Sequence, residues 1–133
     1  MTRTVLTIGG SDPTGGAGIQ ADIKTLTMLG VYGAAAITCV TVQNSHGVTA
    51  IQPLDPELVA AQIRAVLDDH HVHHVKIGMV GSTPIARAIG ESLAGFEGRL
   101  SMIPSSAPLP VNPSWRNPDW TRSGGNCCAV QLF

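Results

Sequence analysis

The amino-acid sequence predicts an α/β fold built on a parallel β-sheet with helices on both faces. Three observations support this prediction. Apolar, strand-like runs alternate with segments of helical periodicity through the first 100 residues. A loop that contains five glycines joins the first of these runs to the first helical segment. Hydrophobic residues make up 44% of the chain and aromatic residues only 4%, so Ala, Val, Ile and Leu must form a core of useful size.

The first strand and helix are expected at residues 5–9 and 16–29. Gly30 follows the helix and is expected to end it, because glycine readily adopts the left-handed conformation found at helix C-termini. The next apolar run, residues 34–42, is rich in β-branched side chains, which favours a parallel strand covered on both faces. The apolar positions of the helix are spaced near the helical period, at Ile19, Ile23, Leu26 and Leu29.

The remaining elements carry clear start signals. Residues 48–51 are compatible with a short strand, and Asp55 followed by Pro56 is expected to cap and begin a second helix. A third core strand is expected at residues 75–79, and the cap-then-proline pattern recurs at Thr83, for a helix that runs to about residue 94. The apolar face of the second helix is predicted to consist of Leu58, Val59, Ile63, Val66 and Leu67.

Three loops follow the C-terminal ends of predicted strands, at residues 10–18, 43–47 and 78–81. In parallel α/β sheets ligands bind at that edge, so we expect these loops to meet at one site. In the first loop, backbone N–H groups at the helix N-terminus are expected to be open to a ligand, although a tight turn without a ligand is the alternative. The loop lacks the Gly-Lys-Ser/Thr of a Walker A motif and fits a dinucleotide fingerprint poorly.

The composition argues against several classes of partner. A net charge of −1 provides no basic surface for nucleic acid, and no apolar run reaches the roughly 18 residues of a membrane span. The N-terminus does not resemble a signal peptide, and three cysteines form no disulfide framework, so we expect a cytoplasmic protein. The histidine-rich residues 70–74 are predicted to form a surface cluster rather than a metal site, because adjacent strand side chains point to opposite faces.

Three sequence blocks, in this order, carry a family resemblance: GGSDPTGGAGIQADIKT at residues 9–25, YGAAAITCVTVQNSHGV at residues 32–48 and KIGMV at residues 76–80. Together they resemble the hydroxymethylpyrimidine/phosphomethylpyrimidine kinases of thiamine synthesis, which belong to the ribokinase-like superfamily. The resemblance covers roughly residues 3–100. It implies that residues 1–100 are the N-terminal portion of a ribokinase-like domain, with a three-layer architecture that is truncated after about its first half.

The family's activity is ATP-dependent phosphorylation of 4-amino-5-hydroxymethyl-2-methylpyrimidine and of its monophosphate. The resemblance places the catalytic residues and the parts that hold ATP and Mg²⁺ beyond residue 133, so no catalytic residue or metal ligand is assigned here. We therefore expect little or no kinase activity from the 133-residue chain. A non-catalytic pyrimidine-binding or regulatory module and a pyridoxal-type kinase are the alternatives, and a homo-oligomer is left open.

Gln43 is the first residue predicted to bind the substrate. A side-chain amide offers an acceptor beside donors, which complements the ring nitrogen and amino group of an aminopyrimidine, and the resemblance implies this pairing. A bond to local backbone is the alternative. The resemblance places Asp22 beside the substrate hydroxymethyl group, whereas an acidic residue in a first helical turn, stabilised by the helix dipole, is its alternative.

Gly10 and Met79 complete the predicted substrate site. Gly10 is expected to allow close backbone approach, and the alternative is plain turn geometry. Met79 is expected to lie on the face of the pyrimidine ring, and the alternative is a core position. Asp12 is expected to fold the glycine loop through an Asx turn, Lys24 to be solvated, and Lys76 has no assigned role.

Residues 101–133 differ in character from the rest. They hold five of the nine prolines and both tryptophans, without helical or strand periodicity, and we expect them to be disordered. A shift of reading frame near residue 100 is one hypothesis, because codons for Met-Ile-Pro-Ser read one base earlier can encode His-Asp-Pro-Val, and the resembled family has Asp-Pro-Val near this place. A genuine proline-rich segment is the other.

Overall fold

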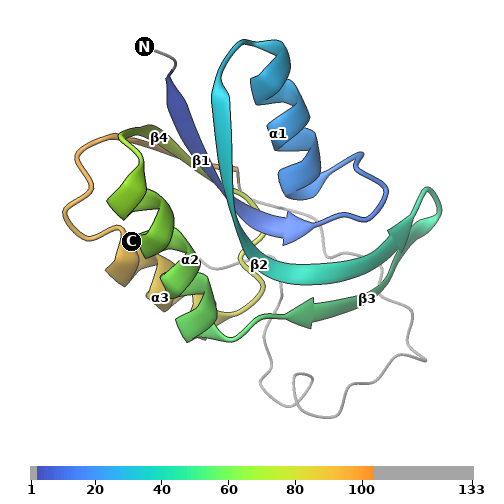
Figure 1. Cartoon of the computed structure of the whole chain (residues 1–133). Coiled ribbons are helices and arrows are strands. Elements are labelled where there is room, and N and C mark those ends of the chain that lie inside the picture. Colours follow the sequence, from blue (N-terminus) through green and yellow to red (C-terminus); the bar gives the residue numbers. More distant parts are fainter. Residues whose placement is uncertain (1–2, 104–133) are drawn as a thin grey trace.

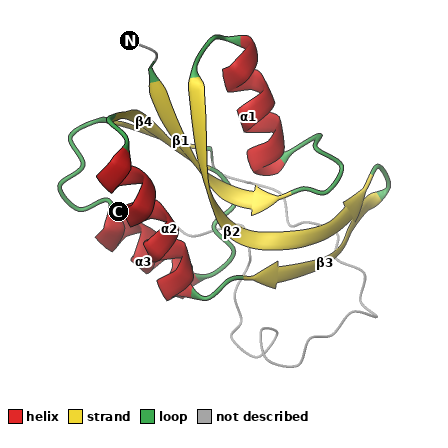
Figure 2. Cartoon of the chain, viewed as in Figure 1, coloured by secondary structure: helices red, strands yellow, loops and turns green. Residues whose placement is uncertain are grey.

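A computed structural model describes residues 3–103 of the chain. Strands and helices alternate as predicted from the sequence, apart from one hairpin (Figures 1 and 2). The elements are β1 (Thr4–Ser11), α1 (Gly18–Met28), β2 (Tyr32–Asn44), β3 (Gly47–Pro53), α2 (Pro56–Asp69), β4 (Val72–Ile77), α3 (Thr83–Ser92) and β5 (Arg99–Met102).

The five strands form one sheet in the order β3-β2-β1-β4-β5. β1 pairs in parallel with β2 and β4, and β4 pairs in parallel with β5. Helix α1 lies on one face of this sheet, while α2 and α3 lie on the other (Figure 1). The predicted three-layer α/β arrangement is therefore confirmed for the described residues.

β3 departs from the predicted parallel arrangement, because it pairs antiparallel with β2. The two strands are joined by Ser45 and His46 alone, and so short a connection cannot carry the chain back for a parallel pairing. The far half of β2 is also less covered than its apolar run suggested. Val40 and Val42 are exposed, so the expectation of a strand buried on both faces is wrong there.

The main hydrophobic core lies between the sheet and helices α2 and α3. Side chains alternate along β1, so Leu6 and Ile8 point into this core while Thr7 points toward α1. The ladder between β1 and β2 contains a β-bulge: Gly9 stands opposite Ile37, but Gly10 stands opposite Cys39. The fully buried residues of this core include Leu6, Ile8, Val59, Ile63, Val75, Ile85 and Ile89.

Helix α1 ends at the predicted glycine. Gly30 has a φ of +68°, and its N–H donates to the Thr27 carbonyl at 3.0 Å while the Val31 N–H donates to the Leu26 carbonyl at 2.9 Å. This pair of bonds is a Schellman motif, which satisfies carbonyls that the helix end leaves open. Leu29 follows the last helical residue and is 71% exposed, so its predicted place on the apolar face is wrong.

Helix α2 begins as predicted, with the Asp55 carboxylate accepting from the Glu57 N–H at 2.9 Å. Within its predicted apolar face, Val59 and Ile63 are buried, but Leu58 is exposed and Ala60 takes a buried place instead. For α3 the predicted cap, Thr83, lies one residue after the observed cap.

Ser82 rather than Thr83 caps α3, through an Oγ that accepts from the Ile85 N–H at 3.4 Å.

The predicted absence of strand structure after residue 100 is wrong for the first residues of that segment. β5 includes Ser101 and Met102, and the Ile103 N–H donates to the Ile77 carbonyl at 3.0 Å. The rest of the predicted proline-rich segment, residues 104–133, lies outside the described residues.

Ile63 and Leu58, which both lie on α2, give a matched test of the core. Ile63→Ala removes a fully buried side chain and is expected to lower the free energy of unfolding by about 2–5 kcal/mol. Leu58→Ala, on the same helix, is expected to cost less than about 1 kcal/mol because Leu58 is 52% exposed. Urea unfolding followed by far-ultraviolet circular dichroism measures both, and equal losses would contradict the packing described here.

Candidate functional site

A cavity of about 360 Å³ lies at the C-terminal ends of β1, β2 and β4. The three predicted loops contribute to its wall, so their convergence is confirmed. Gly10, Gln43 and Met79 all line it, whereas their role as ligand contacts stays a prediction. The lining residues are Gly9, Gly10, Ser11, Asp12, Ala17, Gly18, Thr41, Gln43, Lys76, Gly78, Met79 and Ile103.

The carboxylate of Asp12 organises the glycine loop. Its Oδ1 accepts from the Thr14 N–H and hydroxyl, both at 2.9 Å, and its Oδ2 accepts from the Gly16 and Ala17 N–H groups at 3.1 and 2.8 Å. The predicted Asx turn is therefore confirmed. The N–H groups of Gly16 and Ala17, just before the helix, are not open, because a side chain of the same loop already occupies them. Helix α1 itself begins at Gly18, and its first turn has no side-chain cap.

The charge state of Asp12 follows from these contacts. Asp12 is only 3% exposed, and burial by itself raises the pKa of a carboxyl group. The hydrogen bonds from Thr14, Ala17 and Gly16 outweigh burial and hold the pKa of Asp12 below its ordinary value of 3.8. The loop thus contains its own buried anion, and this anion supplies the negative charge that a helix N-terminus attracts.

Two glycines in this region have close neighbours where a Cβ would stand. A Cβ at Gly10 would lie 2.6 Å from Met79 Cε and 3.0 Å from Cys39 Sγ, so the Met79 thioether rests directly over the bare backbone. Gly18 has a φ of +60°, and a Cβ there would collide with the Gly10 carbonyl oxygen. The first turn of α1 can therefore approach the end of β1 this closely only with a glycine at position 18.

Gln43 is half-buried near the end of β2. The hydroxyl of Thr41 lies 2.9 Å from the Ser11 carbonyl oxygen and 3.3 Å from Gln43 Oε1. A hydroxyl group has one proton to donate, and Thr41 donates it to the nearer acceptor, the Ser11 carbonyl oxygen. Within residues 3–103 Gln43 makes no other side-chain hydrogen bond, so its amide edge is available in the cavity wall.

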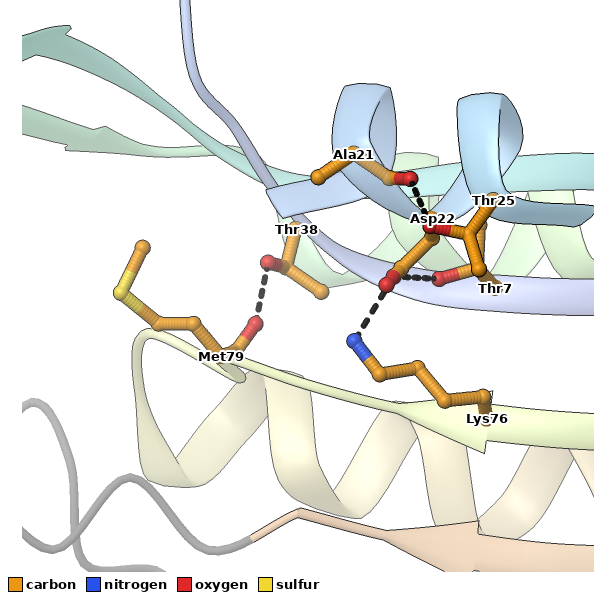
Figure 3. Close-up of polar contacts among 7 residues, drawn as sticks. All are labelled: Thr7, Ala21, Asp22, Thr25, Thr38, Lys76 and Met79. Carbon is orange, nitrogen blue, oxygen red and sulfur yellow. Dashed lines mark hydrogen bonds and ion pairs between the residues drawn. The ribbon is translucent and has the colours of Figure 1, made fainter. Parts of the chain in front are cut away.

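Asp22 lies within α1 and pairs with Lys76. It lies in the second turn of α1, so the alternative of a first-turn acid is wrong. Its Oδ2 accepts from the Thr7 hydroxyl at 2.5 Å and from Lys76 Nζ at 2.7 Å, as Figure 3 shows. Asp22 is absent from the cavity wall among the described residues, and its link to the cavity runs through Lys76. A direct ligand contact of Asp22 stays a prediction.

Lys76 is the residue of this site that sequence reasoning left without a role. It comes from β4, reaches across the sheet end to Asp22, and lines the cavity. Thr38 was also missed, although its hydroxyl donates to the Met79 carbonyl at 2.7 Å and ties the loop after β4 to β2. Each is a polar residue inside a predicted core strand, and that pattern was the available signal.

The two other polar groups near the loop have supporting roles. Gln20 Oε1 accepts from the Asp12 N–H at 2.9 Å, and Gln20 Nε2 donates to the Ser11 hydroxyl at 2.7 Å, which fastens α1 to the end of β1. Lys24 is exposed as predicted, and its ammonium donates to the Gly15 carbonyl at 2.8 Å. Lys24 therefore closes the outer side of the loop.

The predicted histidine cluster lies at the opposite end of the sheet. His70, His71 and His73 line a more open hollow of about 650 Å³ beside the start of β4. His71 and His73 meet edge to face with ring centroids 4.7 Å apart, while His70 stacks on Tyr32 at 5.2 Å. Over residues 3–103, no group of three or more His, Cys, Asp or Glu side chains is placed to hold a metal ion.

No helix in the described part of the chain is long and apolar enough to cross a membrane. The mostly parallel sheet has its cavity at the strand ends, which is where α/β enzymes bind small molecules. The chain belongs to the phosphomethylpyrimidine kinase family, whose sequence model matches residues 12–102.

Individual relatives agree with this assignment. The hydroxymethylpyrimidine/phosphomethylpyrimidine kinase of Rhizobium meliloti is 50% identical over 104 residues, which are 78% of this chain and 39% of that relative. A crystal structure of phosphomethylpyrimidine kinase from Clostridium difficile matches with a TM-score of 0.76 and 41% identity, over 84% of this chain and 51% of that one. The predicted ribokinase-like fold is thus confirmed, and the chain spans well under half of the curated relative's length.

A related class of kinase matches at lower identity. The pyridoxal kinase of Staphylococcus aureus, solved in complex with AMP-PCP and pyridoxal, has a TM-score of 0.72 and 29% identity. The match covers 80% of this chain and 40% of that structure. Vitamin kinases with two different ring substrates therefore share this sheet, and the fold alone does not select the substrate.

Asp12 gives the site a measurable pH dependence. Because the folded state lowers the pKa of Asp12, its contribution to stability is present above the ordinary pKa of 3.8 and is lost as pH falls through the lower folded value. We expect the difference in urea midpoint between the wild type and Asp12→Asn to shrink as pH falls from about 6 to about 3. Asp68→Asn, at an exposed position, is the control, and a constant difference would contradict the assignment.

A glycine pair tests the close approach of α1 to β1. Gly18→Ala is expected to lower the free energy of unfolding by more than about 2 kcal/mol, because it adds a left-handed alanine and a backbone collision. Gly90→Ala, in an open position within α3, is expected to raise it by about 0.5–1 kcal/mol through helix propensity. Thermal and urea unfolding measure both, and a neutral Gly18 variant would show that the loop can move aside.

Proposed function

We propose that the strand-end cavity binds an aminopyrimidine, and that the whole protein transfers phosphate from ATP to 4-amino-5-hydroxymethyl-2-methylpyrimidine and to its monophosphate in thiamine synthesis. One observation carries the proposal: Gly10, Gln43 and Met79 line a single cavity in a chain of the phosphomethylpyrimidine kinase family. The activity is proposed for the whole protein, because this chain spans 39% of its Rhizobium relative.

The chemistry of the wall suits a flat, polar-edged ring. The Gln43 amide supplies an acceptor and donors side by side, which pair with a ring nitrogen and an adjacent amino group. The Met79 thioether lies over Gly10, and a polarisable sulfur packs well against an aromatic face. Because the Asp12 carboxylate is negatively charged and already occupies the Gly16 and Ala17 N–H groups, this part of the cavity favours an uncharged ring over an anion.

The proposed reaction requires an acceptor hydroxyl or phosphate oxygen to attack the γ-phosphate of ATP in line. ATP is the phosphate donor we infer, since the related pyridoxal kinase was solved with the analogue AMP-PCP. Magnesium ions neutralise charge in such reactions, but residues 3–103 provide no cluster of side chains suited to hold one. The proposal therefore assigns neither a magnesium ligand nor a catalytic base among the described residues.

Pyrimidine is favoured over pyridoxal as the substrate. Identity to the pyrimidine kinases is 50% and 41% in the two comparisons, against 29% for the pyridoxal kinase. The Gln43 amide also has a specific partner in the aminopyrimidine edge. A cytoplasmic location, where ATP is present, remains a prediction. A homo-oligomer likewise remains an open possibility.

Gln43→Ala tests the proposed pairing. Isothermal titration of the 133-residue chain with hydroxymethylpyrimidine is expected to show about 10-fold weaker binding for this variant, because the hydrogen bonds between the amide and the edge of the pyrimidine ring are lost. Gln52→Ala is the matched control, since Gln52 is an exposed glutamine whose amide contacts only the Pro53 carbonyl among the described residues. Equal affinities for Gln43→Ala and the wild type, or tighter binding of pyridoxal, would contradict the proposal.

A coupled assay of ADP formation separates the kinase from a non-catalytic pyrimidine-binding module. Turnover by a protein extended to the full length of its relatives, with hydroxymethylpyrimidine as acceptor, supports the kinase. Tight pyrimidine binding without any turnover in that longer protein would favour the module instead.

A further inference from the structure

We propose that Lys76 is the residue that binds the phosphate group of the monophosphate substrate, and that Asp22 with Thr7 holds its ammonium in place. This inference rests on the proposed function, which requires one cavity to accept both an uncharged alcohol and its phosphate ester. The two ligands share a ring and differ by an anionic group. A phosphate monoester carries between one and two negative charges near neutral pH, so the cavity must supply a positive partner for it.

The cavity wall offers one cation among its described residues, and that cation is Lys76. The side chain of Lys76 is 22% exposed, which is low for a lysine. Gly78 stands beside it in the wall, and a Cβ at Gly78 would come within 3.1 Å of Lys76 Nζ. The glycine therefore leaves the space in which the ammonium sits.

The ammonium is oriented but not fully used. Lys76 Nζ donates to Asp22 Oδ2 at 2.7 Å, and the same oxygen accepts from Thr7 at 2.5 Å (Figure 3). An ammonium has three N–H donors, and Asp22 is its one hydrogen-bond acceptor within residues 3–103. Two donors therefore remain for a ligand or for water at the cavity, and the ion pair limits the directions in which they point.

The competing position for a phosphate is the glycine loop that precedes α1, where the Asp12 carboxylate already occupies two of the backbone N–H groups. Phosphates commonly bind at helix N-termini through free backbone N–H groups. Here the N–H groups of Gly16 and Ala17 donate to the buried Asp12 carboxylate, whose charge would also repel an anion. The electrostatics of the cavity thus direct an anionic group toward Lys76.

Lys76 is expected to distinguish the two substrates. A hydroxyl group offers the ammonium one neutral acceptor, whereas a phosphate offers several acceptor oxygens and an opposite charge. Lys76 therefore contributes more to the affinity for the monophosphate than to that for the alcohol. Gln43, which lines the same cavity from β2, contributes to both because it is proposed to contact the shared ring.

The test is isothermal titration of the 133-residue chain with each of the two ligands. Lys76→Met is expected to weaken binding of the monophosphate about 10-fold and binding of the alcohol less than about 3-fold. This variant leaves Asp22 without its counter-ion, so the double variant Lys76→Met/Asp22→Asn removes both charges and decides the matter if the single variant folds poorly. Arg64→Met, at an exposed position on α2, is the control for the loss of one positive charge.

Salt gives a second measurement that a purely structural role would not change. Raising the salt concentration from about 0.05 M to about 0.5 M is expected to reduce the wild-type preference for the monophosphate and to leave the ratio of the double variant nearly constant. Equal losses for both ligands, or no loss, would overturn the role of Lys76 while Gln43-dependent binding of the alcohol upheld the proposed function. Failure of the wild type to bind either ligand would overturn both proposals.

Discussion

The hydrogen bonds between the Asp12 carboxylate and the backbone of its own loop determine how the site is arranged. They fold residues 12–17 into a fixed turn and set where α1 begins. Since α1 carries Asp22, the same bonds locate the partner of Lys76. Gly18 allows this arrangement because it places no Cβ between α1 and the end of β1. A buried carboxylate that is satisfied within its own loop thus fixes the start of α1 and, through Asp22, the position of the Lys76 ammonium.

The cavity has two chemically different parts that depend on different elements. The uncharged part combines the Gln43 amide at the end of β2 with the Met79 thioether that follows β4, and the thioether lies over the bare backbone of Gly10. The charged part is the pair formed by Lys76 and Asp22, which joins β4 to α1 across the edge of the sheet. Such a division suits ligands that share one ring but carry different substituents. It also separates recognition of the ring from recognition of charge.

Local signals in the sequence predicted much of the fold, because they act within a few residues. Asp55 followed by Pro56 defined a helix start, and Gly30 defined a helix end, through contacts inside one turn. The convergence of three loops also followed from the general rule for parallel sheets. The contact of Lys76 with Asp22 could not be predicted this way, because the residues are 54 positions apart and meet only through strand order. The antiparallel β3 depended on the length of one turn, which propensity does not specify.

The β-bulge between β1 and β2 determines which side chains of β2 face the cavity. In an uninterrupted ladder, Gly10 would stand opposite Thr38, and the even-numbered residues Val40 and Val42 would share its face. The single unmatched residue reverses this parity, so Gly10 stands opposite Cys39 and the odd-numbered Thr41 and Gln43 line the wall. The polarity of the cavity wall therefore depends on one extra, unpaired residue in β2 as much as on the residue types themselves.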